Sequence, residues 1–144
     1  MTRYWIAVAS REHVMRGVAG GFAQVCHGKR GPLKLMAAGD WIVYYSPVEQ
    51  FGEKAPCRRF TAIGKINTGN AYEFRMSEAF VPWRIDVTFV SPEKAKEVAI
   101  EPLIDKLSFI QNKQRWGFPF RRGCFSVPLS DFQIIANSMG VTIL

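Results

Sequence analysis

The chain has 144 residues, 48% hydrophobic and 22% charged, so it is long enough to bury the core of one domain and too apolar to be disordered. Its net charge of +7 predicts attraction to polyanions such as nucleic acids. Three cysteines without a CxxC pair exclude a disulfide framework and a zinc ribbon, and we expect neither a metal site nor a cofactor.

The first half of the chain predicts strands around one short helix. Residues 4–9 (YWIAVA) are almost all apolar, as in a strand buried on both faces. Ser10 is placed to cap a helix that ends near Gly17, and an irregular segment follows. Residues 41–46 (WIVYYS) are rich in β-branched and aromatic residues and stop at Pro47, which predicts a second strand.

Three further strand segments are expected at 58–66, within 71–76 and at 83–90. In the last of these, apolar and polar residues alternate, so Trp83 should share a face with Ile85 and the other apolar side chains.

Two helices are predicted late in the chain. The first covers 101–110 with Pro102 in its first turn, and the second opens with a capping-box spacing of Ser130 and Gln133 and closes at Gly140. Many strands with few, late helices indicate an α+β fold: a strongly curved mixed sheet or small barrel flanked by short helices. No repeat or linker divides the chain, so residues 1–144 are expected to form a single domain.

Neither a targeting segment nor a membrane segment is expected. The N-terminal apolar run is too short, and too soon followed by charges, for a signal peptide. No stretch approaches the roughly 18 consecutive apolar residues of a membrane span. Together with the odd number of cysteines, this predicts a cytoplasmic protein with no membrane partner.

Two long stretches hold basic residues and no acid. Residues 13–39 contain four lysines and arginines, and residues 106–130 contain five (Arg16, Lys29, Arg30 and Lys34; Lys106, Lys113, Arg115, Arg121 and Arg122). If the fold brings the two together, they form the positive face that a nucleic-acid-binding protein needs. The alternative is an ordinary solvated surface.

No familiar catalytic motif is present. The sequence lacks a dinucleotide-binding GxGxxG, a Walker loop and a GxSxG elbow. A nucleophile built from Cys57 or Cys124 with His27 depends entirely on the fold, and buried cysteines are usually inert. We therefore expect a binding protein, with one catalytic alternative: an enzyme acting on a nucleotide or small aromatic molecule, with His27 as general base.

Several segments, in order, resemble the EVE domain family. They are YWIAVAS at the start, HGKRGPLKLMAAGDWIVYYSP (27–47), FTAIGKI (60–66), PWRIDVTF (82–89) and PLIDKLSFIQNKQRWGFPFRRGCFSV (102–127). The resemblance implies a PUA-like pseudo-barrel and kinship to YTH and ASCH domains, which hold nucleobases, often modified ones, in an aromatic-lined pocket. Because a fold does not fix a ligand, the identity of the base stays open.

Residues for a base pocket and its rim follow from this resemblance and from the chemistry of bases. Bases stack on aromatic rings and hydrogen-bond at their edges, while lysine and arginine hold the flanking phosphates. The pocket candidates are Ser10, Phe22, His27, Tyr45, Ser46, Trp83 and Trp116, and the rim candidates are Lys29, Arg30, Lys113, Arg115, Arg121 and Arg122.

Several of these candidates have a structural alternative. Ser10 could serve as a helix cap, His27 as a structural histidine, Trp83 as core, and the arginines as solvated surface. For Phe118 and Phe120, which follow Trp116, burial in the core is favoured.

The expected function is thus the binding of RNA or DNA that carries a modified base. A monomer is expected, although the sequence leaves the oligomeric state open.

Overall fold

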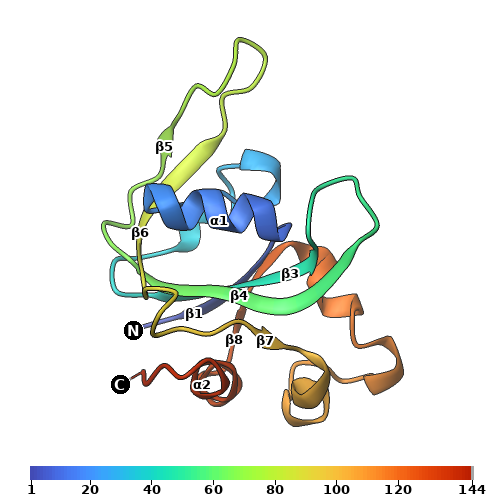
Figure 1. The fold of residues 1–144 in the computed structure, drawn as a ribbon. Helices are drawn as coiled ribbons and strands as arrows, with labels where there is room; N and C mark the ends of the chain where they lie inside the picture. Colours follow the sequence, from blue (N-terminus) through green and yellow to red (C-terminus); the bar gives the residue numbers. More distant parts are fainter. Residues whose placement is uncertain (144) are drawn as a thin grey trace.

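The computed structural model describes residues 1–143, and one curved mixed sheet forms its centre (Figure 1). Its strands are β1 (Tyr4–Val8), β2 (Phe22–Ala23), β3 (Trp41–Val48), β4 (Pro56–Ile66), β5 (Tyr72–Glu73), β6 (Trp83–Phe89), β7 (Val98–Ala99) and β8 (Cys124–Val127). Their order in space is β2-β6-β4-β3-β1-β8, with β5 paired to β6 and β7 paired to β4. Strands β1 and β3 run parallel, and the other pairs of strands are antiparallel.

Short helices pack around this sheet. They are α1 (Arg11–Gly20), α2 (Leu129–Ser138) and five 3₁₀ helices: η1 (Cys26–Gly28), η2 (Leu33–Leu35), η3 (Glu101–Lys106), η4 (Lys113–Arg115) and η5 (Phe118–Arg122). The predicted α+β class and curved mixed sheet are confirmed. None of the helices among residues 1–143 is long and apolar enough to span a bilayer.

The hydrophobic core consists of two clusters on opposite faces of the sheet. In β1, Trp5 and Ala7 belong to one cluster and Ile6 to the other, which is why this strand reads as continuously apolar. Helix α1 covers the first face and α2 the second, as Figure 1 shows. Trp83 packs partly against the same cluster as Ile85, as the alternation predicted.

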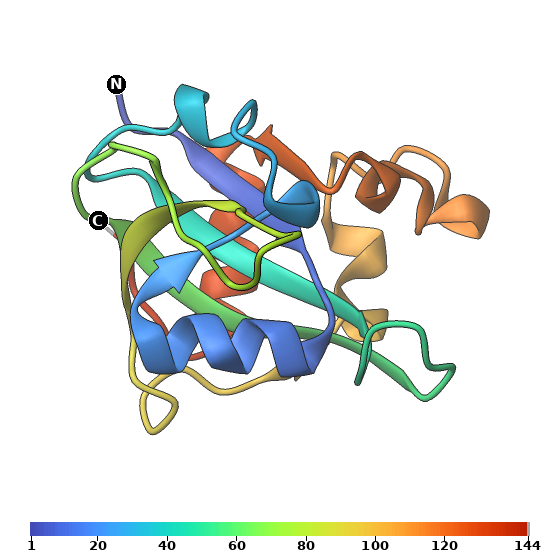
Figure 2. The same cartoon turned by 90° about the horizontal axis from the view of Figure 1, so that it is seen from above.

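From β5 to the start of β6 the chain leaves the body of the protein. This segment, residues 72–82, is called the arm below; it projects upward in Figure 1 and crosses above the sheet in Figure 2. It exposes large apolar side chains: Tyr72, Phe74, Met76 and Phe80.

Helix α1 and strand β3 are both longer than predicted. The backbone amide of His13 donates to Ser10 Oγ (3.4 Å), so Ser10 is the expected cap, but the helix runs past Gly17 to Gly20. Position 17 inside the helix needs a glycine, because a Cβ there would lie only 2.6 Å from the carbonyl oxygen of Phe22. Strand β3 continues through Pro47 because the pairing with β4 shifts register there, and a bulge tolerates a residue without an N–H.

The helix predictions near the C-terminus are partly wrong. Residues 101–106 form a 3₁₀ helix and the segment to residue 110 is not helical, although Leu107 and Ile110 are buried as predicted. Helix α2 is capped by Pro128 and ends at Ser138, so Ser130 is not its cap. Within its first turn, Asp131 accepts hydrogen bonds from the backbone amides of Ser108 and Phe109 (2.9 and 3.1 Å), which ties α2 to the preceding segment.

Candidate functional site

The segment after β2 makes a left-handed turn. Cys26, His27 and Gly28 have φ angles of 49°, 60° and 80° in succession, and we call these three residues the junction turn. Left-handed backbone costs about 1–2 kcal/mol for each residue with a side chain. Contacts with the surrounding structure must therefore hold this turn in place.

Three surface segments supply those contacts. The Cys26 thiol lies 3.8 Å from the carbonyl oxygen of Arg122, just before β8. The His27 ring meets the edge of Phe51, from the β3–β4 loop, at 5.9 Å between ring centroids. A Cβ at Gly28 would lie 2.3 Å from Cβ of Pro82, so only glycine allows this approach to the arm.

The junction turn also brings together the two acid-free basic stretches. Lys29 and Arg30 follow it directly, and Arg121 and Arg122 lie across the Cys26 contact; all four side chains are exposed. Figure 2 shows η1 beside the segment that leads into β8. The two basic stretches therefore meet here at their backbones, while the Arg121 guanidinium lies over Phe118 (5.5 Å) and that of Arg122 over Phe125 (4.4 Å). That their side chains form one positive face stays a prediction. We call the exposed set around the turn the junction surface: His27, Lys29, Arg30, Phe51, Phe80, Arg121 and Arg122.

Trp83 borders this surface. The ring is half-buried against the core, and the Arg30 guanidinium lies 4.7 Å from its centroid. The indole thus packs against the core and is also contacted by the exposed Arg30 side chain. Its role as a stacking wall stays a prediction, although its position fits one.

Two predicted pocket residues lie inside the protein. Ser46 is completely buried, and its hydroxyl is 2.8 Å from that of Thr61. Tyr45 is 2% exposed and packs on Phe120 with 4.4 Å between ring centroids, and burial raises its pKa to about 12. Neither side chain lines the surface, because β3 is central in the sheet and buried on both faces up to Ser46.

Trp116 and its neighbours divide between core and surface. Trp116 is half-buried with its edge toward Tyr45 (6.3 Å), and Arg115 beside it is exposed. Phe120 is buried as expected, but Phe118 is 62% exposed, so the prediction that Phe118 belongs to the core is wrong. The short 3₁₀ turns of this segment place these closely spaced aromatic residues in different environments.

Lys113 is a structural residue. Its Nζ donates to the carbonyl oxygens of Ile104 and Leu107, both at 3.0 Å. It therefore satisfies carbonyl groups around the end of η3, while the residue itself is exposed, and its place on a phosphate rim stays a prediction.

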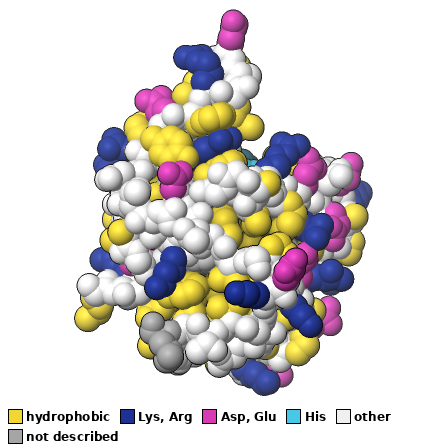
Figure 3. Space-filling view, turned by 60° about the vertical axis from the view of Figure 1, so that its left-hand side comes forward, with side chains coloured by type: hydrophobic (Ala, Val, Ile, Leu, Met, Phe, Trp, Pro, Cys, Tyr) yellow, Lys and Arg dark blue, Asp and Glu magenta, His cyan; other side chains and the backbone are white. Residues whose placement is uncertain are grey.

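Phe22, the remaining pocket candidate, belongs to a stack that the sequence did not reveal. The Arg84 guanidinium lies 3.8 Å from the ring centroid of Phe22 and 3.9 Å from that of Phe74, on the arm. Arg84 Nε also donates to Gln24 Oε1 (3.0 Å). Figure 3 shows basic and hydrophobic side chains gathered at the base of the arm.

Few contacts among the described residues bear on the catalytic alternative, which stays a prediction. Within residues 1–143, His27 makes no side-chain hydrogen bond, and no group of three His, Cys, Asp or Glu residues could hold a metal ion. Burial raises the pKa of Cys124 to about 12 and that of Cys57 to about 11, so both thiols stay protonated at neutral pH. A protonated thiol is a poor nucleophile.

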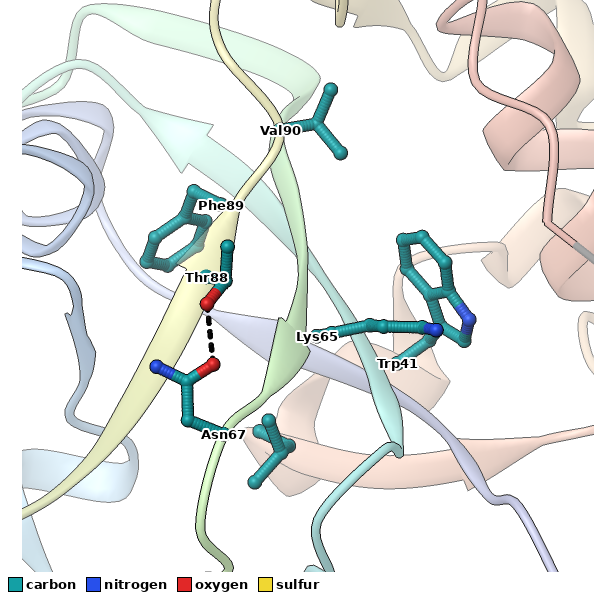
Figure 4. A pocket seen from close by; sticks show the side chains of 7 residues that line it. Trp41, Lys65, Asn67, Thr88, Phe89 and Val90 are labelled. Atoms are coloured by element: carbon teal, nitrogen blue, oxygen red, sulfur yellow. Dashed lines mark hydrogen bonds between the residues drawn. The ribbon is translucent and has the colours of Figure 1, made fainter.

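A separate groove of about 430 Å³ lies between β4, the end of β6 and the start of β3 (Figure 4). Its lining is Trp41, Lys65, Ile66, Asn67, Thr88, Phe89 and Val90. Lys65 Nζ lies over the Trp41 ring (5.2 Å), and the Thr88 hydroxyl donates to Asn67 Oδ1. None of the predicted site residues lines this groove.

Comparisons with known proteins agree on one family. The EVE domain model matches residues 3–138. The UPF0310 protein YdcG of Bacillus subtilis is 45% identical over 142 residues, covering 99% of this chain and 95% of the relative. A UPF0310 protein of Mesorhizobium japonicum is 46% identical over 142 residues, covering 97% of this chain and 93% of the relative.

Solved structures share the fold at low sequence identity. A hypothetical protein from Leishmania major has a TM-score of 0.63 at 18% identity, and a protein from Rhodopseudomonas palustris has 0.57 at 17% identity. Each comparison covers 96% of this chain and 94% of the other.

Proposed function

Because the chain belongs to the EVE domain family, we propose that it is a nucleic-acid-binding module in which the junction surface contacts the sugar–phosphate backbone. In this proposal it acts as a cytoplasmic monomer, binds RNA or DNA, and holds one nucleobase, a modified one, against an aromatic wall. The proposed role is binding and not catalysis.

The observation that carries the proposal is the meeting of two distant basic segments at the junction turn. Lys29 and Arg30 lie more than 90 positions from Arg121 and Arg122, yet the contact between Cys26 and Arg122 joins their segments. Neither stretch contains an acid to neutralise it. Phosphates bind to such a surface by displacing counterions, which makes the binding strongly dependent on salt.

Exposed aromatic rings stand within the same surface. Phe51 is 80% exposed and Phe80 39% exposed, and rings of this kind stack with bases irrespective of sequence. We place the selected base on Trp83, where it takes the position that Arg30 now occupies, while Arg30 turns to a phosphate. A cation over a ring contributes about 0.5–1 kcal/mol at an exposed site, and a stacked base about 1–3 kcal/mol, so the exchange is favourable.

The proposal is tested by the salt dependence of oligonucleotide binding. The double variant R121A/R122A should bind more weakly to every sequence, and the slope of log affinity against log salt should become shallower by about 1.4–1.8. The control is K94A/K96A, which removes two charges from the β6–β7 connection, beside the end of α2, and should leave the slope unchanged. An equal change of slope in both double variants would show that net charge alone, and not the junction surface, governs binding.

A further inference from the structure

The stack at the base of the arm holds a guanidinium flat between two aromatic rings. Phe22 comes from β2, Arg84 from β6, and Phe74 follows β5 directly. Strand pairing places Phe22 opposite Asp86 and Tyr72 opposite Arg84, so all of these side chains project from one face of the small sheet β2-β6-β5. Both faces of the guanidinium are covered, and only its edges can form hydrogen bonds.

Arg84 has no counter-charge. The residue is 8% exposed, and no carboxylate among residues 1–143 forms an ion pair with it. Asp86, on the same face, instead accepts a hydrogen bond from the Tyr72 hydroxyl (2.6 Å). Burial accordingly lowers the pKa of Arg84 from its ordinary value, but an arginine still stays protonated. A buried charge without a partner is costly, and such charges are normally paired.

The outer edge of this guanidinium is free. Nε is satisfied by Gln24 Oε1, whereas neither Nη group donates to any residue from 1 to 143. Over the same residues, no buried side-chain nitrogen or oxygen lacks a partner. It follows that the Nη groups reach solvent, although the rest of the side chain is enclosed. Two parallel N–H donors at the open end of a fixed guanidinium match the two oxygens of a phosphate.

We propose that Arg84 is an oxyanion-binding residue, and that in the complex its Nη edge binds one phosphate of the nucleic-acid backbone. This deepens the proposed function and rests on it for the source of the phosphate. A phosphate supplies the counter-charge that Arg84 lacks, which the edge of a neutral base does not. The hydrogen bond to Gln24 fixes how the guanidinium is turned within its plane, and the rings of Phe22 and Phe74 fix the tilt of that plane. The contact therefore selects one phosphate of the bound strand.

The test combines variants of Arg84 with oligonucleotides in which one phosphate at a time is replaced by a neutral methylphosphonate. With the wild-type protein, one replacement should weaken binding about tenfold, as expected for a hydrogen bond to a charged group. In R84Q the same replacement should have no further effect, and the salt slope should become shallower by about 0.7. The control K94Q removes one charge beside the end of α2 and should keep the wild-type methylphosphonate profile.

A purely structural role for Arg84 predicts a different result. In that case R84Q lowers affinity at all positions, and its methylphosphonate profile matches that of the wild type, which overturns the proposal. If R84Q fails to fold, R84K retains the charge and removes the fork: a weaker effect of the critical methylphosphonate than in the wild type supports the proposal, and a wild-type profile overturns it.

The source of the oxyanion is tested separately, by titrating inorganic phosphate into the wild-type protein and following the Arg84 Nε–H NMR signal. If wild-type protein binds no oligonucleotide, the proposed function fails. A phosphate-dependent shift of Arg84 would then identify free phosphate as the ligand, and the absence of a shift would overturn the oxyanion site as well.

Discussion

The substitution Trp83→Ala separates a role in binding from a role in folding. Truncation of a completely buried tryptophan to alanine lowers the free energy of unfolding by about 3–5 kcal/mol. Because Trp83 is only half-buried, we expect a loss of about 2 kcal/mol, which lowers the unfolding temperature by about 4–8 °C in a chain of this length. A stacked base contributes about 1–3 kcal/mol, so affinity for the preferred base should fall roughly 5- to 150-fold.

Two measurements on the same variant check this expectation. Thermal unfolding of the free protein reports the cost to the fold, and binding to a panel of modified and unmodified oligonucleotides reports selectivity. Phosphate-driven binding without base preference should remain, since the basic side chains of the junction surface are intact.

The matched control is Trp41→Ala. Trp41 is also half-buried with a cation over its ring, but it lies at the groove of Figure 4. It should lose similar stability and keep full selectivity. Retention of base preference by the folded Trp83→Ala protein would refute the stacking role and assign Trp83 to the core alone.

Two further predictions concern polar side chains, the half-buried His13 and the buried Ser46. Burial lowers the pKa of His13 in the folded state. The contribution of the neutral ring to stability is therefore complete above about pH 6.5 and is lost as the pH falls through the lowered pKa of the folded state. His13→Gln should lose less stability than the wild type between pH 7.5 and 5, and parallel urea-unfolding profiles of the two proteins would contradict this. Ser46→Ala leaves the buried Thr61 hydroxyl without its partner and should cost about 1–3 kcal/mol in urea unfolding with unchanged oligonucleotide affinity, whereas weaker binding at full stability would return Ser46 to the site.

The parts of the fold that were predictable depend on local patterns. Strand β1 is buried on both faces, so its sequence is apolar throughout. Strand β6 is buried on one face, so apolar residues alternate with polar ones and show on which face Trp83 lies. Pro47 was misread as a strand end because the bulge that accommodates it depends on the partner strand. Phe118 was misplaced because a 3₁₀ turn carries no periodicity from which its orientation could be read.

The candidate site was predictable in composition but not in geometry. Both basic stretches could be recognised in the sequence because they contain no acid. The contact that joins them, between Cys26 and Arg122, spans 96 positions and is visible only in the structure. The stack on Arg84 was missed altogether, because Phe22, Arg84 and Phe74 come from three separate segments. The one local signal was an arginine within a half-buried strand, and the pairing of the nearby Asp86 with Tyr72, which leaves Arg84 without an ion pair, is visible only in the structure.

The central claim is that the junction surface binds nucleic acid, and a titration of the ¹⁵N-labelled protein with a single-stranded oligonucleotide at low salt tests it most directly. The account predicts shifts of the backbone amides at 26–31, at 80, 81 and 83, and at 121–123, with the amides of the groove at Trp41, Lys65 and Val90 unchanged. Shifts confined to the groove, or a spectrum that does not change at all, would contradict it.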